Sequence, residues 1–240
     1  MYANEIYKNA IRRNVLTYTN GRLLETQKDL VDEAGYSLFV NGEYIDRMVC
    51  SPWDLREAVI GYLYMKEYMN DLKDIDQMEI SEGKQEIRVQ VSKSLIPDMS
   101  KPTENGECFT VKQIVGFSRK LEEKSGLFHR TGGVHCAALV RNGQFVSYRE
   151  DVSRHMAVDK VVGNCLMEHI SMKNAVLVFS GRVPAEILQK VAAMGCAMII
   201  AKSAPTNYAC DLAEELGVTL VGFARGNKFN VYAHPERICQ

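Results

Sequence analysis

The chain has 240 residues, of which 46% are hydrophobic, and this length suits one sizeable α/β domain with a smaller appendage. Its formal net charge of -1 at pH 7 argues against a nucleic acid or an anionic membrane surface as the main partner. No stretch approaches the roughly 18 uninterrupted apolar residues that a membrane-spanning helix needs. The N-terminal residues lack the apolar core of a secretory signal, so we expect a cytoplasmic protein.

The first half of the chain predicts a small antiparallel ribbon followed by one helix. Asn20-Gly21 and Asn41-Gly42 interrupt alternating apolar and polar residues, and such dipeptides supply the positive φ angles of two-residue hairpin turns. Serine and proline at positions 51 and 52 open a helix predicted over 52–69. Beyond it we expect one strand at 86–91 and a loop. Residues 1–109 are therefore predicted to form a smaller N-terminal ribbon-helix subdomain with its loop.

The second half predicts a three-layer α/β domain with a mixed sheet over residues 110–240. Thr110 and Gln113 form a capping box that opens a helix. Two strands and a helix follow, three short apolar strands then alternate with two helices, and a turn leads to a last strand. The predicted strands are 134–140, 144–149, 175–180, 196–202, 218–223 and 229–232, and the predicted helices after the capping box are 152–168, 184–194 and 206–216.

Polar and glycine residues collect where the predicted strands end. In an open α/β sheet, ligands bind beyond the carboxyl ends of the strands, where helix N-termini also present free N–H groups. We expect these residues to form a donor-rich rim for an anionic ligand, such as a nucleotide or a phosphate-bearing cofactor. The candidates are Thr131, Gly132, Gly133, Arg154, Asp159, Lys160, Ser180, Arg182, Lys202, Ser203, Thr206, Arg225, Gly226, Asn227 and Lys228.

Several candidates also have an ordinary structural interpretation. A single Lys or Arg is more often a solvated surface charge than a ligand contact. Asp159-Lys160 fits an exposed helix pair, and Gly132-Gly133 fits a tight turn. His135 and His155 are candidate proton-transfer groups, but neither has a Ser, Cys or carboxylate at a diagnostic spacing, so a purely structural role remains open for both.

The seven cysteines are scattered singly, with no C-x-x-C pair that would indicate a zinc knuckle or a dithiol redox site. Cys136, Cys165, Cys196 and Cys210 lie in predicted strands and helices and are expected to be buried. Cys108 lies in a polar loop immediately before a predicted helix start. Both features favour an accessible and somewhat acidified thiol, so Cys108 is the candidate reactive cysteine.

Several motifs occur in a fixed order along nearly the whole chain. They are VNGEYIDRMVCSPWDLREAVIGYLYMKE, TGGVH followed by CAAL, REDVSRHMAVDKVVG, SGR, KSAPT and LVGF-R. This series resembles the FdhD/NarQ family of formate dehydrogenase accessory proteins. The resemblance implies a cytidine-deaminase-like fold and a homodimer.

The resemblance also implies a function. Members of the family act as sulfurtransferase-type carriers: they take sulfur as a persulfide from a cysteine desulfurase and pass it to the molybdenum bis-guanine-dinucleotide cofactor of formate dehydrogenase. Cys108 would carry the persulfide, with His135 or His155 assisting proton movement. The family's cofactor-contacting stretch corresponds by motif to Phe223, Ala224, Arg225, Gly226, Asn227 and Lys228.

The sequence departs from two expected motifs, and each departure bears on an alternative function. The family typically has a pair of cysteines in the loop before the TGG segment, whereas residues 92–109 hold only Cys108. A non-catalytic cofactor chaperone or docking module that has lost the sulfur-transfer step is therefore the second hypothesis. A zinc deaminase is disfavoured, because the cysteine ligands of its P-C-x-x-C motif are missing; we expect no bound zinc.

Overall fold

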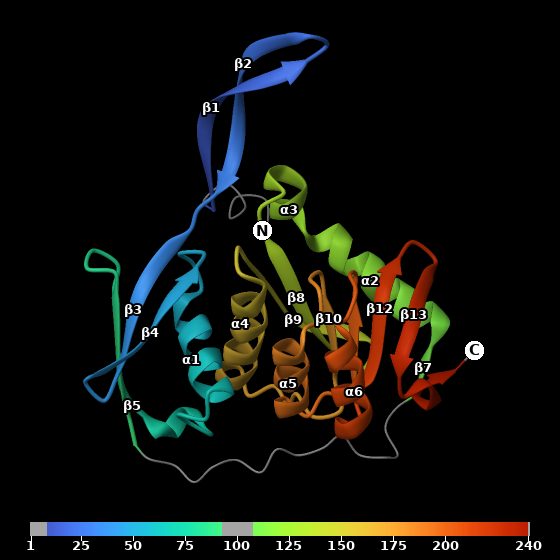
Figure 1. Cartoon of the computed structure of the whole chain (residues 1–240). Coiled ribbons are helices and arrows are strands. Elements are labelled where there is room, and N and C mark those ends of the chain that lie inside the picture. Colours follow the sequence, from blue (N-terminus) through green and yellow to red (C-terminus); the bar gives the residue numbers. More distant parts are fainter. Residues whose placement is uncertain (1–8, 93–107, 240) are drawn as a thin grey trace.

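The computed structural model describes residues 9–92 and 108–239. Its centre is a six-stranded mixed sheet of order β13-β12-β11-β10-β8-β9 (Figure 1). β10, β11 and β12 run parallel, whereas β8 runs antiparallel to β10, and β9 and β13 pair antiparallel at the two edges. The strands are β8 His135–Arg141, β9 Gln144–Asp151, β10 Val176–Phe179, β11 Met198–Ala201, β12 Thr219–Arg225 and β13 Lys228–Ala233.

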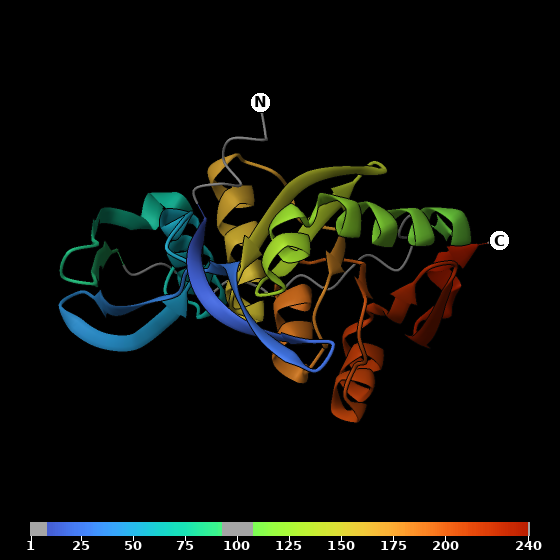
Figure 2. The same ribbon diagram turned by 90° about the horizontal axis from the view of Figure 1, so that it is seen from above.

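Helices cover both faces of this sheet, which confirms the predicted mixed α/β architecture. α4 (Arg154–Met167), α5 (Ala185–Ala193) and α6 (Asn207–Leu216) lie on one face, and α2 (Val111–Lys124) crosses the other (Figure 2). Each face has its own apolar core, because the short central strands β10 and β11 are buried on both sides. α3 (Gly126–Thr131) connects α2 to β8. A relation to the cytidine-deaminase fold stays a prediction.

The N-terminal part forms two separate sheets. β1 (Ala10–Thr19) and β2 (Arg22–Val31) make a ribbon that projects from the body (Figure 1). A four-stranded sheet of order β4-β3-β6-β5 is built from β3 (Ala34–Val40), β4 (Glu43–Cys50), β5 (Ile75–Ser81) and β6 (Glu86–Val91). α1 (Leu55–Met65) joins this sheet to the larger one, and a short 3-10 helix, η1 (Leu72–Asp74), precedes β5.

Two glycines let α1 approach α4 at backbone distance. A Cβ atom at Gly61 would lie 1.8 Å from the carbonyl oxygen of Asp159, and one at Gly163 would lie 2.0 Å from that of Glu57. Real side chains cannot come so close, so any larger residue would force the helices apart. This close packing places the first turn of α4 beside the last turns of α1.

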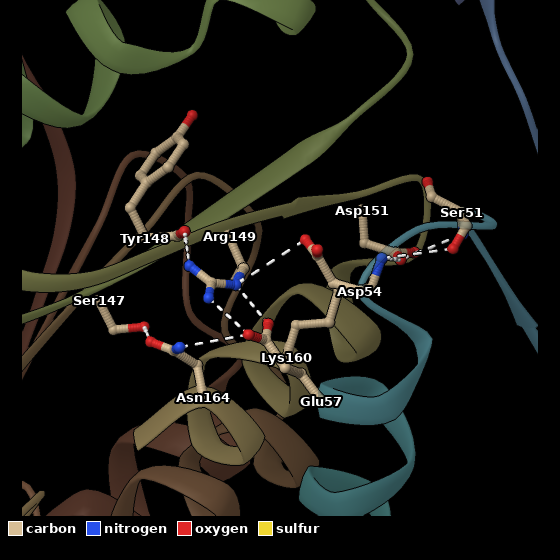
Figure 3. A network of polar contacts seen from close by, with 9 residues as sticks. All are labelled: Ser51, Asp54, Glu57, Ser147, Tyr148, Arg149, Asp151, Lys160 and Asn164. Carbon is tan, nitrogen blue, oxygen red and sulfur yellow. Dashed lines mark hydrogen bonds and ion pairs between the residues drawn. The ribbon is translucent and has the colours of Figure 1, made fainter. Parts of the chain in front are cut away.

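A network of buried and partly buried polar groups joins α1, β9 and α4 (Figure 3). Arg149 on β9 donates through Nη2 to Glu57 at 2.6 Å, and Asn164 on α4 donates to the same carboxylate at 3.2 Å. Lys160 is fully buried and pairs with Asp151 at 2.7 Å. Lys160 and Asp151 are both withdrawn from water, so each charge depends on the other for compensation.

Most predicted elements agree with the structure, and the differences have local causes. Asn20-Gly21 and Asn41-Gly42 do make hairpin turns with positive φ, but the two hairpins belong to different sheets. β5 and α3 were missed, because β5 has little alternation and α3 has only six residues. Two short parallel strands, β7 (Phe109–Thr110) and β14 (Ile238–Cys239), were also missed; β14 follows the 3-10 helix η2 (Pro235–Arg237).

Within the described ranges, no helix is long and apolar enough to cross a membrane.

Candidate functional site

The carboxyl ends of β10, β11 and β12 meet at one edge of the large sheet, as the rim prediction requires. The parallel register places Ser180, Lys202 and Arg225 at that edge. β8 runs the opposite way, so its first residue, His135, lies there too. Backbone hydrogen bonds tie the loops together, since Val183 donates to Ala204 at 3.1 Å and Phe223 donates to Ser203 at 3.3 Å. We call this edge the rim. Its residues are Thr131, Gly132, Gly133, Arg154, Ser180, Arg182, Lys202, Ser203, Thr206 and the stretch Phe223–Lys228.

Arg154 occupies the first helical position of α4, and its Nε atom is buried. That atom makes no hydrogen bond to any of the described residues. A buried guanidinium nitrogen without an acceptor is costly, and an anionic ligand oxygen would satisfy it. The N-terminus of α4 contributes further free N–H groups, and its dipole also favours negative charge.

His135 lies beside this arginine in a partly buried position. Its Nδ1 atom is 3.3 Å from Ser180 Oγ, and its ring stands next to that of Phe179. Burial, together with the positive charge of Arg154, lowers the pKa of His135. The imidazole is therefore neutral at pH 7 and can offer a ring nitrogen to a ligand at the rim.

The other rim cations are partly engaged already. Lys202 pairs with Glu122 of α2, and this contact lowers the pKa of Glu122. Arg225 is exposed and donates from Nε to the backbone oxygen of Lys202 at 2.8 Å. This bond does not use the two terminal nitrogens of its guanidinium group. Arg182, Lys228, Gly226 and Asn227 are exposed around the same edge.

Thr206 and Phe223 shape the loops of the rim. Thr206 caps α6 by accepting a hydrogen bond from the backbone N–H of Ala209 at 3.3 Å. Phe223 is 46% exposed with a φ of +51°, an unusual conformation for an aromatic residue, so its ring stands outward next to buried Ala224. An exposed ring at this edge is a surface on which a planar base could stack.

The Gly132-Gly133 turn has a structural explanation. Gly132 ends α3 with a φ of +67°, and a Cβ atom at Gly133 would lie 2.6 Å from Val31 of the ribbon. Both glycines are needed to bring α3, β8 and the ribbon together. Thr131 caps the same turn, because its Oγ1 accepts from the N–H of Gly133.

Asp159 and Lys160 do not form the exposed helix pair that their sequence suggested. Both are fully buried, because α1 covers the face of α4 on which they lie. Lys160 is fully buried against Asp151 and the backbone oxygen of Ser51, where no ligand at the rim can reach it, so it is withdrawn from the ligand-binding residues. Asp159 pairs with Lys190 of α5 and faces a cavity instead.

The cavity has a volume of about 800 Å³ and lies between α1, α4 and α5. His155 and Glu186, 3.5 Å apart, line it near the N-termini of α4 and α5, which is the rim side. Asp159 Oδ2 is buried there and accepts no hydrogen bond from the described residues. Sequence patterns missed the cavity because it is walled by helices from both halves of the chain.

Cys108 is exposed, as predicted, but its environment differs from the expectation. A side-chain hydrogen bond with Cys239 raises the pKa of Cys108, so the prediction of an acidified thiol is wrong. The helix start cannot compensate, because Thr110 and Gln113 already occupy the cap of α2. Burial raises the pKa values of Cys136 and Cys210, and those of Cys50 and Cys165 to about 12.

The thiol and the rim lie at opposite ends of the sheet. Cys108 precedes the first turn of α2, whereas Glu122, in its last turn, contacts Lys202 of the rim; a helix of this length spans roughly 20 Å. His135 and His155 are therefore not brought to Cys108, and their predicted role as its proton-transfer partners is not supported. Across the described part of the chain, no group of three or more His, Cys, Asp or Glu side chains is placed to hold a metal ion.

The fold is that of a mixed α/β protein with cationic side chains gathered at one edge of its large sheet and a separate exposed thiol. A family model described as FdhD/NarQ matches residues 31–106 and 94–239. The sulfur carrier protein FdhD of Geobacillus kaustophilus is 38% identical over 95% of this chain and 97% of its own length. That of Staphylococcus haemolyticus is 33% identical over 94% and 96%. A crystal structure from Desulfotalea psychrophila, described as a candidate formate dehydrogenase accessory protein, has a TM-score of 0.83 at 28% identity, covering 96% of this chain and 100% of that chain. The chain belongs to the FdhD/NarQ family.

Proposed function

We propose that this protein is a sulfur carrier that serves formate dehydrogenase. Its relatives of similar length are named sulfur carrier proteins, and Cys108 is the most exposed of its cysteines. In the proposed reaction, the Cys108 thiolate attacks the outer sulfur of a persulfide on a cysteine desulfurase. A Cys108 persulfide forms and the thiolate of the desulfurase leaves, so the exchange is balanced without a further oxidant.

The rim would bind the acceptor of that sulfur, the molybdenum bis-guanine-dinucleotide cofactor. The observation that carries this assignment is Arg154: a buried guanidinium nitrogen without an acceptor, at a helix N-terminus, fits a phosphate oxygen. Ser180, Ser203 and the Phe223–Lys228 turn lie along the same edge of the sheet. The rim is cationic and donor-rich, which matches the charge of a dinucleotide.

The cavity beside the rim would hold a guanine base. Its volume of about 800 Å³ suits a small organic ligand. The partnerless Asp159 Oδ2 inside it is an acceptor, and guanine presents two adjacent N–H donors. Asp159 therefore stays among the proposed ligand contacts, in the cavity and not on the rim.

Nucleotide binding is tested by titrating the purified protein with GDP. Arg154→Gln should weaken binding by about 1.5–3 kcal/mol, the range for a hydrogen bond to a charged group. Arg119→Gln removes the same charge from an exposed position on α2 and should leave the affinity unchanged. Equal affinities for wild type and Arg154→Gln would remove the rim from the proposal.

Sulfur loading is tested by incubating the protein with a cysteine desulfurase and cysteine. Intact mass should show one added sulfur in wild type and none in Cys108→Ala. Nucleotide binding without any added sulfur in wild type would favour the second candidate, a cofactor chaperone without sulfur transfer. Equal loading of Cys108→Ala would show that another cysteine is the carrier.

A further inference from the structure

Cys108 and Cys239 come from distant parts of the sequence and meet in the fold. β7 and β14 pair in parallel, with Phe109 opposite Ile238 and Thr110 opposite Cys239. Because side chains alternate along a strand, Cys108 projects from the same side as Thr110 and hence as Cys239. The register of β7 and β14, continued by one residue to Cys108, therefore places both thiols on one side of this small sheet.

The two side chains are also in direct interaction. They are joined by a side-chain hydrogen bond, with Cys108 exposed and Cys239 partly buried. Of the remaining cysteines, four are buried, and Cys210 lies on α6, on the opposite face of the large sheet from α2. Among the described residues, Cys239 is the only cysteine on a strand paired with β7.

We propose that Cys108 and Cys239 form a dithiol–disulfide site, in which Cys239 releases the sulfur carried by Cys108. The loading of Cys108 rests on the proposed function, whereas the ability of the pair to form a disulfide does not. The site supplies, from the C-terminal strand, the second thiol that the loop before β7 does not contain.

The release step is balanced in atoms and electrons. The Cys239 thiolate attacks the inner sulfur of the Cys108 persulfide, a bond forms between the two cysteine sulfurs, and the bond to the outer sulfur breaks. The outer sulfur takes the electron pair and leaves as hydrosulfide, HS⁻. The two cysteines lose two electrons in all, and the outer sulfur is reduced by the same two. A thiol reductant would return the pair to its starting state.

The surrounding structure permits the small movement that a disulfide requires. The two cysteines are diagonal neighbours, and a bridge needs their Cα atoms within about 7 Å. β7 and β14 contain only two residues each, so few hydrogen bonds resist an adjustment. Arg237 anchors the chain just before β14 through Gly217 and Thr219, which keeps Cys239 near its partner.

The experiment compares wild type, Cys239→Ala and Cys210→Ser. Cys210 is a matched control, because it is also partly buried but lies on α6, away from β7 and β14. Each protein is loaded with desulfurase and cysteine, separated from the reagents, and followed by hydrosulfide release and intact mass. Wild type and Cys210→Ser should release about one hydrosulfide per loaded chain and lose two alkylatable thiols. Peptide mapping should find Cys108 joined to Cys239.

Cys239→Ala should retain the added sulfur and release hydrosulfide at least about tenfold more slowly, because the attacking thiolate is absent. Equal release from Cys239→Ala and wild type would overturn the proposal, and so would a disulfide that joins any other pair.

A second measurement separates this inference from the proposed function. The three unloaded proteins are treated with diamide, a thiol oxidant. A Cys108–Cys239 disulfide in wild type, together with a failure to load sulfur, would retain the dithiol site and reject the carrier. Sulfur loading on Cys108 without such a disulfide in either experiment would retain the carrier and reject the dithiol site.

Discussion

The role of a single side chain in this protein depends on the groups that bury it. Lys160 is the clearest case: its ammonium group is completely buried between Asp151, the backbone oxygen of Ser51 and the ring of Trp53. Asp151 in turn accepts from the N–H groups of Ser51 and Ser153, the residue that caps α4. The ion pair therefore orients the helix start that carries Arg154.

Removing the lysine charge should destabilise the fold strongly. Lys160→Met leaves Asp151 buried and uncompensated, at an expected cost of about 3–5 kcal/mol in the free energy of unfolding. Glu86→Gln, which breaks the exposed pair with Arg88, should cost at most about 1 kcal/mol. Urea unfolding measures both, and similar small losses would mean that the buried pair contributes little.

Partly buried histidines should make stability depend on pH. Burial lowers the pKa values of His135 and His155, so in acid the folded state binds fewer protons than the unfolded state, whose histidines titrate near 6.5. Their contribution is complete above about pH 6.5 and is lost as the pH falls below it. His135→Gln should flatten the loss between about pH 7 and 5 in urea unfolding. Equal slopes for wild type and His135→Gln would contradict the assignment.

At the scale of elements, the contact between α1 and α4 holds the N-terminal part against the large sheet. Gly61 and Gly163 allow backbone contact there, and Glu57, Arg149 and Asn164 satisfy one another around it (Figure 3). The same contact walls one side of the cavity. The packing of α1 against α4 thus determines the shape of the cavity and turns the Asp159 side chain toward it.

Adding one methyl group at this contact should be disruptive. Gly61→Ala or Gly163→Ala would place a Cβ within 2.0 Å of a backbone oxygen, so we expect at least about 1–3 kcal/mol of destabilisation. Gly116→Ala in α2 meets nothing within 4 Å and should stabilise by about 0.5–1 kcal/mol through helix propensity. Thermal unfolding of the three variants tests the contrast, and stable Gly61→Ala and Gly163→Ala proteins would refute the close packing.

On the scale of the whole molecule, the rim and the thiol pair lie at opposite ends of the strands of the large sheet. Arg225 ends β12 at the rim, whereas Arg237, just before β14, binds Thr219 at the start of the same strand. A seven-residue strand spans roughly 20 Å, in agreement with the length of α2. Sites this far apart without shared partners act additively.

The two functions should therefore be separable. Cys108→Ser should bind GDP as wild type does, and Arg154→Gln should still accept one sulfur on Cys108, because neither change reaches the other site. Calorimetric titration measures the first outcome and intact mass the second. A change of more than about threefold in GDP affinity for Cys108→Ser would show that the two ends are coupled.

Local signals in the sequence determined much of this protein. Asn-Gly turns, the Thr110–Gln113 capping box and the alternation after residue 131 predict the strands and helices, because these patterns depend on neighbours in the chain. They also place the rim, since parallel strands must end at a common edge. Only the tertiary structure decided which side chains face one another. The burial of Lys160, the cavity around Asp159 and the meeting of Cys108 with Cys239 each depend on segments far apart in sequence, and no local pattern records such contacts.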